Sequence, residues 1–211
     1  MSAKPADTER RSERAQAQCE RILCAAQQCF IEHGFHAASM AGIAEAAQMS
    51  PGLIYRYFPS KSAIILAIIQ RQLEEKRADI AALQGESDLA PCIEDLFRRW
   101  QTGDRQVMNA PLFLEMTAEA SRDPHIADAV RNADRLAQAD FSAWLRQRKA
   151  DEGKDISGQE AQWRTFILQC FIEGLAIRAI REPDLDRTLL SHSLDRLLPF
   201  ILSGNDKDNS K

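Results

Sequence analysis

Apolar residues recur every three or four positions along most of this chain, which is the spacing of an amphipathic helix. Between residues 14 and 33, for example, Ile22, Ala26 and Phe30 form one stripe. No segment shows a sustained alternation of apolar and polar residues, which is the pattern of a half-buried strand. The pattern therefore predicts an all-α protein of about nine helices.

Residue types that start and stop helices divide the pattern. Gly34 is a left-handed cap after the first helix, and Ser39 and Ser50 are good N-caps. Pro51 takes the first helical position, where a missing N–H costs nothing, and Pro59 ends that helix. The helices are predicted at about 14–33, 40–47, 51–58 and 61–83, from 88 onward, and at about 109–120, 124–149, 158–181 and 185–202.

These boundaries predict two domains flanked by two tails. Residues 14–60 form a small three-helix domain, and residues 61–203 form a larger helical domain. Residues 1–13 and 204–211 are polar, and we expect them to be a disordered basic arm and a disordered tail.

Charge and hydropathy exclude some classes of protein. No apolar run approaches the roughly 20 residues of a membrane span, and the N-terminus lacks the apolar core of a signal peptide, so we expect a cytoplasmic protein without membrane contact. The net charge is −4. Residues 1–61 carry seven Lys or Arg against six Asp or Glu, which leaves 20 against 25 in the rest. Nucleic-acid binding would therefore depend on the positions of a few cations.

Candidate chemistry is sparse. There are five cysteines and no CxxC, so we predict neither a disulfide framework nor a metal site. No phosphate-binding glycine loop or nucleophile motif is present, so we predict neither an enzyme nor a cofactor. Cys19, Cys24 and Cys29 leave a redox sensor open as an alternative, although a spacing of five residues places them on different helix faces.

The segment MSPGLIYRYFPSK, residues 49–61, has an unusual composition for a short helix. Two helices joined by a tight turn over residues 39–57 have helix-turn-helix spacing, in which the second helix enters the DNA major groove. Tyrosine hydroxyls and a lysine ammonium donate to phosphates, and an exposed arginine can contact guanine. We expect Leu53, Ile54 and Phe58 to face the core instead.

The segment from Ile22 to Ile65 resembles the TetR-type bacterial transcriptional regulators. The motifs F-x-x-x-G-F-x-x-x-S-x-x-x-I-A, S-P-G-x-I-Y-x-Y-F and P-S-K match that family in order and spacing. The rest of the chain resembles the family only in the number, length and order of its helices.

The resemblance implies a homodimeric regulator that binds a pseudo-palindromic operator in double-stranded DNA. It implies that Arg56 contacts a base, that Lys61 contacts a phosphate, and that the arm contacts the backbone or the minor groove. The implied DNA-binding residues are Ser39, Ser50, Pro51, Gly52, Tyr55, Arg56, Tyr57, Lys61, Arg10, Arg11 and Arg14. The family also implies repression and control by a small-molecule effector.

Two further surfaces are predicted in the larger domain. The last helix carries more apolar residues than one core stripe requires. The predicted dimer interface is Ile167, Phe171, Gly174, Ile177, Leu190, Leu194, Leu197 and Ile201. The predicted effector site is Phe97, Trp100, Met108, Phe113, Met116, Glu119, Asp140, Phe141, Trp144, Trp163, Phe166, Cys170 and Glu173.

Both sets have a simpler interpretation as ordinary core. The acids on apolar faces, which also include Glu115, either pair with Arg178 or Arg181 or orient a cationic or polar ligand. A second function class stays open as well, namely an all-helical module that uses the helix at 51–58 to bind a protein partner.

Overall fold

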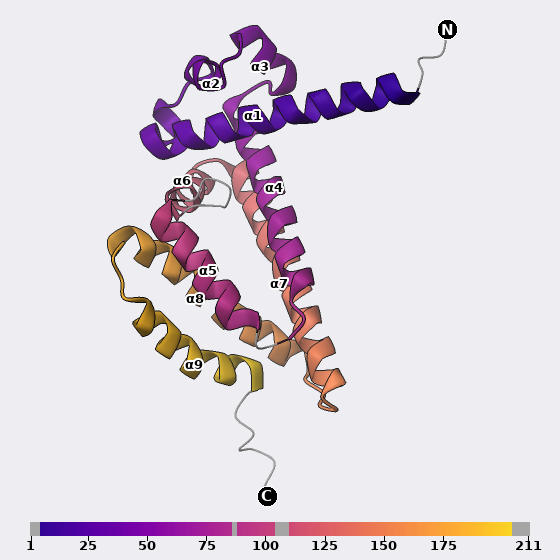
Figure 1. Cartoon of the computed structure of the whole chain (residues 1–211), viewed down its shortest axis with the longest axis vertical. Helices are drawn as coiled ribbons and strands as arrows, with labels where there is room; N and C mark the ends of the chain where they lie inside the picture. The colour runs from indigo at the N-terminus through magenta and orange to yellow at the C-terminus, as the bar shows by residue number, and fades with distance from the viewer. Residues whose placement is uncertain (1–4, 86–87, 104–109, 204–211) are drawn as a thin grey trace, which may run out of the picture. The chain divides into compact units, whose positions relative to one another are not determined.

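The computed structural model describes residues 5–85, 88–103 and 110–203, with side chains from Arg10 onward except those of Arg11 and Ser203. These residues form nine helices and no strand (Figure 1), so the prediction of an all-α fold is confirmed. The helices are α1 (Pro5–Ala37), α2 (Met40–Ala46), α3 (Pro51–Tyr57), α4 (Lys61–Ala82), α5 (Leu89–Thr102), α6 (Ala110–Ala120), α7 (Pro124–Asp151), α8 (Gly158–Arg181) and α9 (Arg187–Ser203).

The described chain separates into two compact units. The first contains the residues up to Gln70 together with Glu115–Ala129, and the second contains Arg71–Leu114 and the residues from Val130 onward. The sequence placed a single boundary after Ser60. In the structure α4, α6 and α7 each contribute residues to both units, so the first unit is not one continuous stretch of chain.

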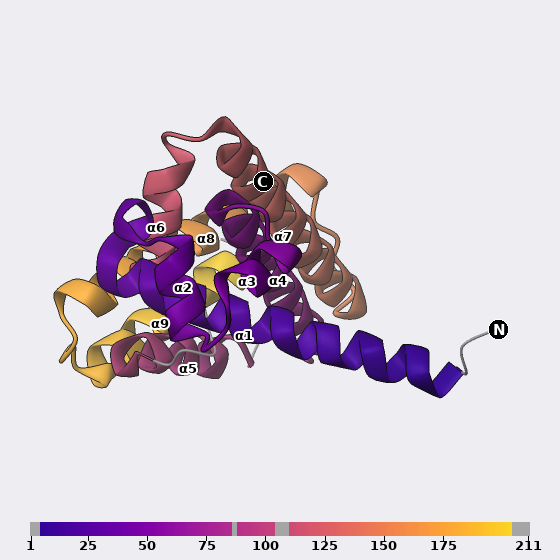
Figure 2. The same ribbon diagram turned by 90° about the horizontal axis from the view of Figure 1, so that it is seen from above.

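Helix α1 is longer than the sequence predicted. It begins at Pro5, so the prediction of disorder is wrong for residues 5–13, while residues 1–4 and 204–211 lie outside the described part. Five of the nine residues from 5 to 13 are Glu, Arg or Ala, which are good helix formers, and this explains why a polar segment is helical. The N-terminal part of α1 projects beyond α2 and α3 (Figures 1 and 2). Gly34 interrupts the helix with φ 77° and ψ 159°, close to its predicted end.

The first unit has a core of aliphatic and aromatic side chains. Ile22 and Phe30 of α1, Ile43 of α2, Ile54 of α3 and Ile65 of α4 are all fully buried there. Helix α2 packs against α1, and α3 packs against α2. The short helix α3 is therefore held by its inward side, and its other side is exposed to solvent.

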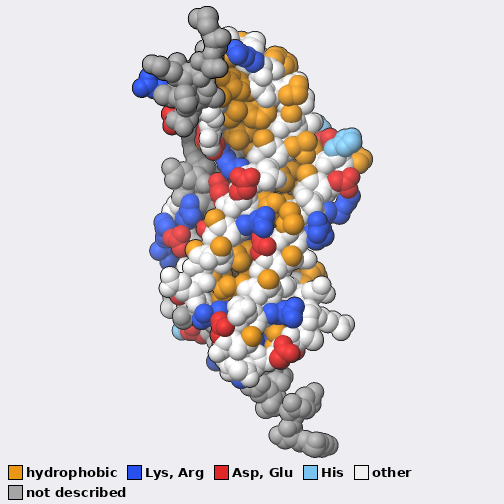
Figure 3. All heavy atoms as spheres, turned by 90° about the vertical axis from the view of Figure 1, so that its right-hand side faces the viewer, with side chains coloured by type: hydrophobic (Ala, Val, Ile, Leu, Met, Phe, Trp, Pro, Cys, Tyr) orange, Lys and Arg blue, Asp and Glu red, His pale blue; other side chains and the backbone are white. Residues whose placement is uncertain are grey.

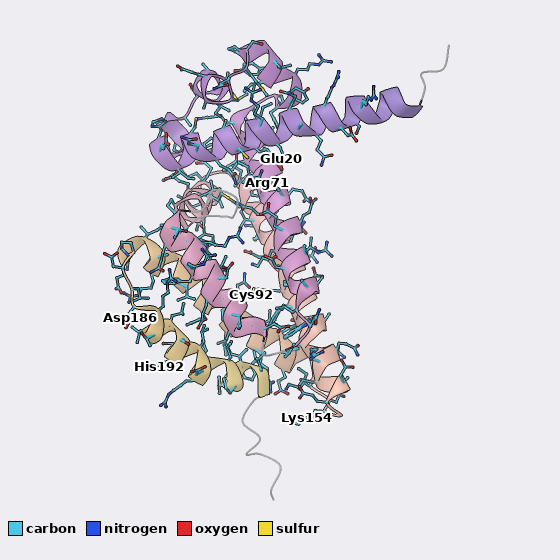
Figure 4. The ribbon with its side chains drawn as sticks, in the orientation of Figure 1. Glu20, Arg71, Cys92, Lys154, Asp186 and His192 are labelled. Carbon is cyan, nitrogen blue, oxygen red and sulfur yellow. The ribbon has the colours of Figure 1, made fainter. Side chains whose placement is uncertain are left out.

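The second unit is built around α5, which packs against α8 and α9. Its core cluster combines residues from α5, α7, α8 and α9, among them Ile93, Phe97, Phe141, Leu145, Leu168, Leu175, Leu194, Leu198 and Ile201. Local caps set the starts of its last two helices. The Ser157 hydroxyl accepts a hydrogen bond from the Glu160 N–H at 3.0 Å and so caps the start of α8. Asp186, marked in Figure 4, accepts from the Thr188 N–H at 2.9 Å, and hydrogen bonds from Thr188 lower the pKa of that carboxyl.

Among the described residues, no single helix combines the length and the apolar composition that crossing a membrane needs. Helices α3 and α4 pass that test only when taken together, and they are bent by 55° where they meet. On the face shown in Figure 3, acidic and basic side chains are interspersed with apolar ones.

Candidate nucleic-acid interface

The predicted caps of α2 and α3 are confirmed. The Ser39 hydroxyl accepts a hydrogen bond from the Gly42 N–H at 3.0 Å, and the Ser50 hydroxyl accepts from the Leu53 N–H at 3.3 Å. Pro51 occupies the first turn of α3, where its fixed φ suits a helix and no N–H is missed. These local contacts start both helices of a helix-turn-helix within twelve residues of one another.

The turn between α2 and α3 contains Gln48, which the sequence pattern did not indicate as important. Gln48 has φ 52°, in the left-handed region that non-glycine residues rarely adopt. The Arg21 guanidinium on α1 donates to the Gln48 carbonyl at 3.3 Å and to its side-chain oxygen at 3.4 Å. Arg21 therefore ties the turn to α1, and nothing in the local sequence pattern indicates this contact.

Helix α3 has a buried side and an exposed side. Ile54 is fully buried and Phe58 nearly so, while Leu53, expected in the core, is half-buried. Tyr55 is 54% exposed, Arg56 is exposed and Tyr57 is half-buried. The exposed side thus presents a phenol and a guanidinium to solvent.

The N-terminal end of α3 is open as well. Pro51 and Gly52 are exposed, and a methyl group added to Gly52 would meet no atom within 4 Å. The packing of the protein therefore does not require glycine at this position.

Lys61 is engaged within the first unit. Its ammonium donates to the backbone carbonyls of Phe35 at 2.7 Å, His36 at 3.1 Å and Ala38 at 2.6 Å. An ammonium has three donors, so each N–H has a partner. Lys61 also lies 4.8 Å from the centre of the Phe35 ring. These contacts close the C-terminal end of α1. The phosphate contact stays a prediction, and it would have to compete with three carbonyls.

The same end of α1 is held by the segment Glu115–Ala129. The Phe35 N–H donates to the Glu115 carboxylate at 3.0 Å. Glu119, only 6% exposed, lies 3.3 Å from the His36 imidazole and 3.8 Å from the Arg122 guanidinium. Glu119 therefore has partners within the first unit, and the structure does not group it with the effector residues of the second.

The predicted basic arm is a helix. Arg10 and Arg14 lie on exposed turns of α1, and the Arg11 side chain is outside the described residues. Their positions are consistent with contact to a partner, which stays a prediction.

The structure divides the predicted effector residues between the two units. Met116 lies in the first unit with Glu119, and Met108 is outside the described residues. Phe97 and Phe141 are core residues of the second unit, against which Trp100, Phe113 and Trp144 pack while half-buried. Trp163, Phe166 and Cys170 are exposed on α8, and Glu173 is half-buried.

The acids on apolar faces have partners other than the predicted arginines. Asp140 forms an ion pair with Arg77 at 2.5 Å, and Arg178 pairs with Glu182. A groove of about 450 Å³ between α5 and α9 includes Phe97 of the predicted site. Its lining mixes the apolar side chains of Pro91, Phe97 and Leu190 with charged and polar ones, of which Arg98 and Asp95 pair with each other.

The predicted dimer residues divide into two groups. Leu190, Leu194 and Ile201 are buried in the core of the second unit. Ile167, Phe171, Gly174, Ile177 and Leu197 are half-buried. The exposed apolar residues on α8 and α9 are instead Trp163, Phe166, Ile180, Leu189 and Phe200.

The cysteines are all free thiols. Burial, with a smaller contribution from Glu20 or Glu32, raises the pKa of Cys19 and Cys29. Because the thiolate is the reactive form, the raised pKa disfavours Cys19 and Cys29 as redox sensors, while Cys24 is exposed.

Comparison with known proteins identifies the fold and its class. Residues 22–68 match the bacterial regulatory proteins of the tetR family, and residues 86–199 match the C-terminal domain of BetI-type transcriptional repressors. The chain belongs to the TetR family. The HTH-type transcriptional regulator UidR of Escherichia coli K12 is 35% identical over 147 residues, which cover 68% of this chain and 71% of UidR.

Solved structures agree with this assignment. Salmonella enterica GusR superimposes with a TM-score of 0.71 at 27% identity, covering 89% of this chain and 96% of GusR. Bacillus subtilis FadR in complex with stearoyl-CoA superimposes with a TM-score of 0.66 at 20% identity, covering 88% and 98%. Members of the family are DNA-binding transcriptional regulators and not enzymes, so this chain is a regulator too.

Proposed function

We propose that the protein is a homodimeric repressor whose operator binding is controlled by a small-molecule effector in the second unit. The observation that carries the proposal is the two-sided helix α3, with Ile54 and Phe58 buried and Tyr55 and Arg56 exposed. A short helix with a fixed inward side and a polar outward side suits the DNA major groove.

Each residue of this interface has a proposed task. Arg56 contacts a base edge, and Tyr55 and Tyr57 contact the backbone and the groove edge. The N-terminal end of α3, with Ser50, Pro51 and Gly52, approaches a phosphate. Ser39, Arg10, Arg11 and Arg14 add backbone contacts. The phosphate role of Lys61 is the weakest of the set, because its three donors already serve backbone carbonyls.

Dimerisation is supported by the exposed apolar side chains of α8 and α9. Phe166 is 59% exposed and Leu189 57% exposed, and the rings of Trp163 and Phe200 lie 6.2 Å apart between the two helices. An exposed apolar surface of this kind favours a second protein surface as its cover. We propose that a second copy covers it, because two recognition helices about one DNA turn apart match a pseudo-palindromic operator.

Repression and effector control are supported by similarity. Residues 86–199, which make up most of the second unit, match a domain described as that of BetI-type repressors, and FadR, which has a related fold, was solved in complex with stearoyl-CoA. A ligand that binds one conformation more tightly shifts the protein toward it, and a shifted spacing of the recognition helices would release the operator.

The test begins with selection of duplexes from a random pool by the full chain, followed by fluorescence anisotropy at two salt concentrations. We expect a pseudo-palindromic motif and an affinity that falls steeply with salt, by a slope of about 0.9 per neutralised phosphate. A transcription assay with the selected site in a promoter then measures repression. Recovery of no motif, or a sedimentation mass of one chain at micromolar concentration, would contradict the proposal.

A further inference from the structure

Helices α7 and α8 face each other through pairs of polar residues. The Gln138 amide donates to the Gln169 side-chain oxygen at 2.5 Å, and the Ser142 and Thr165 hydroxyls lie 2.9 Å apart. The two helices are antiparallel, so four residues forward on α7 correspond to four residues back on α8. Each pair combines like with like, an amide with an amide and a hydroxyl with a hydroxyl.

The next turn continues the series with two acids. Four residues before Gln138 is Asp134, and four residues after Gln169 is Glu173, and both are half-buried. Burial raises the pKa of both carboxyls, and the charge of Asp134 raises that of Glu173 further. Asp134 and Glu173, called here the acid pair, therefore face each other as like charges.

The acid pair has too little positive charge around it. Lys76 of α4 is the cation that acts on both carboxyls, and Gln169 adds a hydrogen bond to Glu173. These contacts lower the two pKa values but do not offset the effect of burial. Among the residues that the structure describes, this one ammonium acts on two carboxylates, which leaves a net negative charge in a half-buried place.

Gln72 of α4 adds an unsatisfied amide. It is only 6% exposed, and neither its side-chain nitrogen nor its side-chain oxygen has a hydrogen-bond partner among the described residues. A buried amide that lacks both partners costs stability, so such groups are rare unless something else satisfies them. Arg71, the residue before it, is marked on α4 in Figure 4.

The register of α4 against α7 brings Gln72 to the acid pair. The Arg77–Asp140 ion pair at 2.5 Å and a hydrogen bond of 3.2 Å from the Trp144 indole to the Leu83 carbonyl show that the two helices run in the same direction. Because Arg77 lies opposite Asp140, five residues earlier on each helix place Gln72 of α4 opposite Arg135 of α7. Arg135 is the residue next to Asp134.

The helical spacing of α4 gives the same result. Gln72 precedes Lys76 by one turn, so the two side chains share a face of α4. Lys76 acts electrostatically on both Asp134 and Glu173. The unsatisfied amide thus points toward the acid pair.

We propose that the acid pair and Gln72 bind the polar end of the effector, and that this effector carries a protonated amine next to a hydrogen-bonding group. The inference rests on the proposed effector control. An amine donates to both carboxylates and neutralises their excess charge, and a neighbouring hydroxyl or amide satisfies Gln72. A carboxylate ligand would add a third negative charge, and a purely apolar ligand would leave the Gln72 amide without partners and the excess negative charge in place.

The first test uses matched probes on the full chain. Ethanolamine and tyramine are compared with the counterparts in which a hydroxyl or a carboxylate replaces the amine, by calorimetric titration and by Tm. We expect the amines alone to bind, and the double variant Asp134→Asn, Glu173→Gln to weaken their binding by roughly 10- to 100-fold.

Each contrary outcome has a distinct meaning. Binding of the alcohols or acids but not the amines overturns the ligand class and leaves effector control standing. Equal amine binding by the double variant overturns the site. If none of the probes binds, the inference fails. To test effector control itself, a small-molecule cell extract is added to the protein bound to its selected operator. Effector control is contradicted only if the extract does not release the operator.

A second test needs no ligand and separates function from structure. A carboxyl whose pKa is raised by folding contributes stability below its unfolded pKa and loses it as pH rises through the folded value. The acid pair therefore costs stability near neutral pH. We expect Glu173→Gln to raise Tm by about 2 °C at neutral pH, a gain that fades near the ordinary carboxyl pKa of about 4.

The control variant is Asp184→Asn, which removes one charge at an exposed loop position outside the acid pair. It should leave Tm unchanged at both pH values. If Glu173→Gln lowers Tm at neutral pH, the carboxylate has a structural role and the proposal is overturned.

Discussion

Helix α3 and the facing sides of α7 and α8 both carry polar groups. Those of α3 face solvent, whereas those of α7 and α8 face each other inside the protein. On α3 the buried side is purely apolar and the polar side chains of Tyr55 and Arg56 point to solvent. Between α7 and α8, amides, hydroxyls and carboxyls face one another. The first arrangement leaves its hydrogen bonds for an external partner, and the second uses most of them within the protein. Loss of a polar group should therefore affect DNA binding on α3, and stability in the amide and hydroxyl pairs of α7 and α8.

The largest effect is expected for Arg56→Ala on operator binding. A base contact is worth about 1–3 kcal/mol per half-site, so a dimer should lose roughly 100-fold in affinity. Repeated selection should show lost preference at one position of each half-site, with an unchanged free energy of unfolding. Arg146→Ala, an exposed arginine on α7, is the matched control. An unchanged motif would remove Arg56 from the base contacts.

Lys61→Ala should act mainly on stability, although Lys61 belongs to the same unit as the DNA-binding motif. It removes three charge-assisted hydrogen bonds to backbone carbonyls, and we expect a loss of about 2 kcal/mol in denaturant unfolding and about 4–8 °C in Tm. Arg56→Ala is the control, because it removes a charge from the same unit without these contacts.

The salt dependence of operator binding decides whether Lys61 has a second role. A decrease of about 2 in the slope per dimer would add a phosphate contact in each subunit. An unchanged slope would assign Lys61 to the end of α1 alone.

Gly52→Ala should weaken operator binding by roughly tenfold if the backbone of α3 approaches a phosphate closely. The added methyl meets no atom of the protein, and alanine in a helix is up to about 1 kcal/mol more favourable than glycine. Unfolding should therefore be unchanged or slightly harder. Gly158→Ala, also with open space at the start of α8, is the control for binding. Full affinity in Gly52→Ala would contradict a close approach.

Ser142→Ala should have the smallest effect, about 1 kcal/mol in unfolding and none on DNA binding. The Thr165 hydroxyl donates to the Ala161 carbonyl at 2.7 Å, so Ser142 is the donor of the pair. The double variant with Thr165→Val should cost less than the sum of the two single variants, because the two hydroxyls are coupled. Strict additivity would mean that the pair contributes nothing.

The two regions also differ in how far the sequence predicts them. Ser39, Ser50, Pro51 and Pro59 act on their own neighbours, so the helices of the DNA-binding motif could be predicted locally. The partners of Lys61 are carbonyls more than twenty residues away, and no local rule connects them.

The effector region was predicted less well for the same reason. Glu173 stood out as an acid on an apolar face, but its partner Asp134 follows only from the register of α7 against α8. Trp163 and Phe166 were expected in a pocket and are exposed. Helical periodicity shows that a face is apolar but does not show which surface covers it.

The discontinuous first unit has a consequence for protein engineering. A fragment ending near Gln70 would contain all of α1 to α3 yet lack Glu115 and Glu119, which hold the Phe35 N–H and His36 at the end of α1. Exchanging the DNA-binding part with that of another regulator therefore requires transplanting residues 115–129 as well. A chimera joined once, between α3 and α4, would carry another protein's residues at positions 115–129. Its α1 would then lack the contacts that Glu115 and Glu119 make with Phe35 and His36.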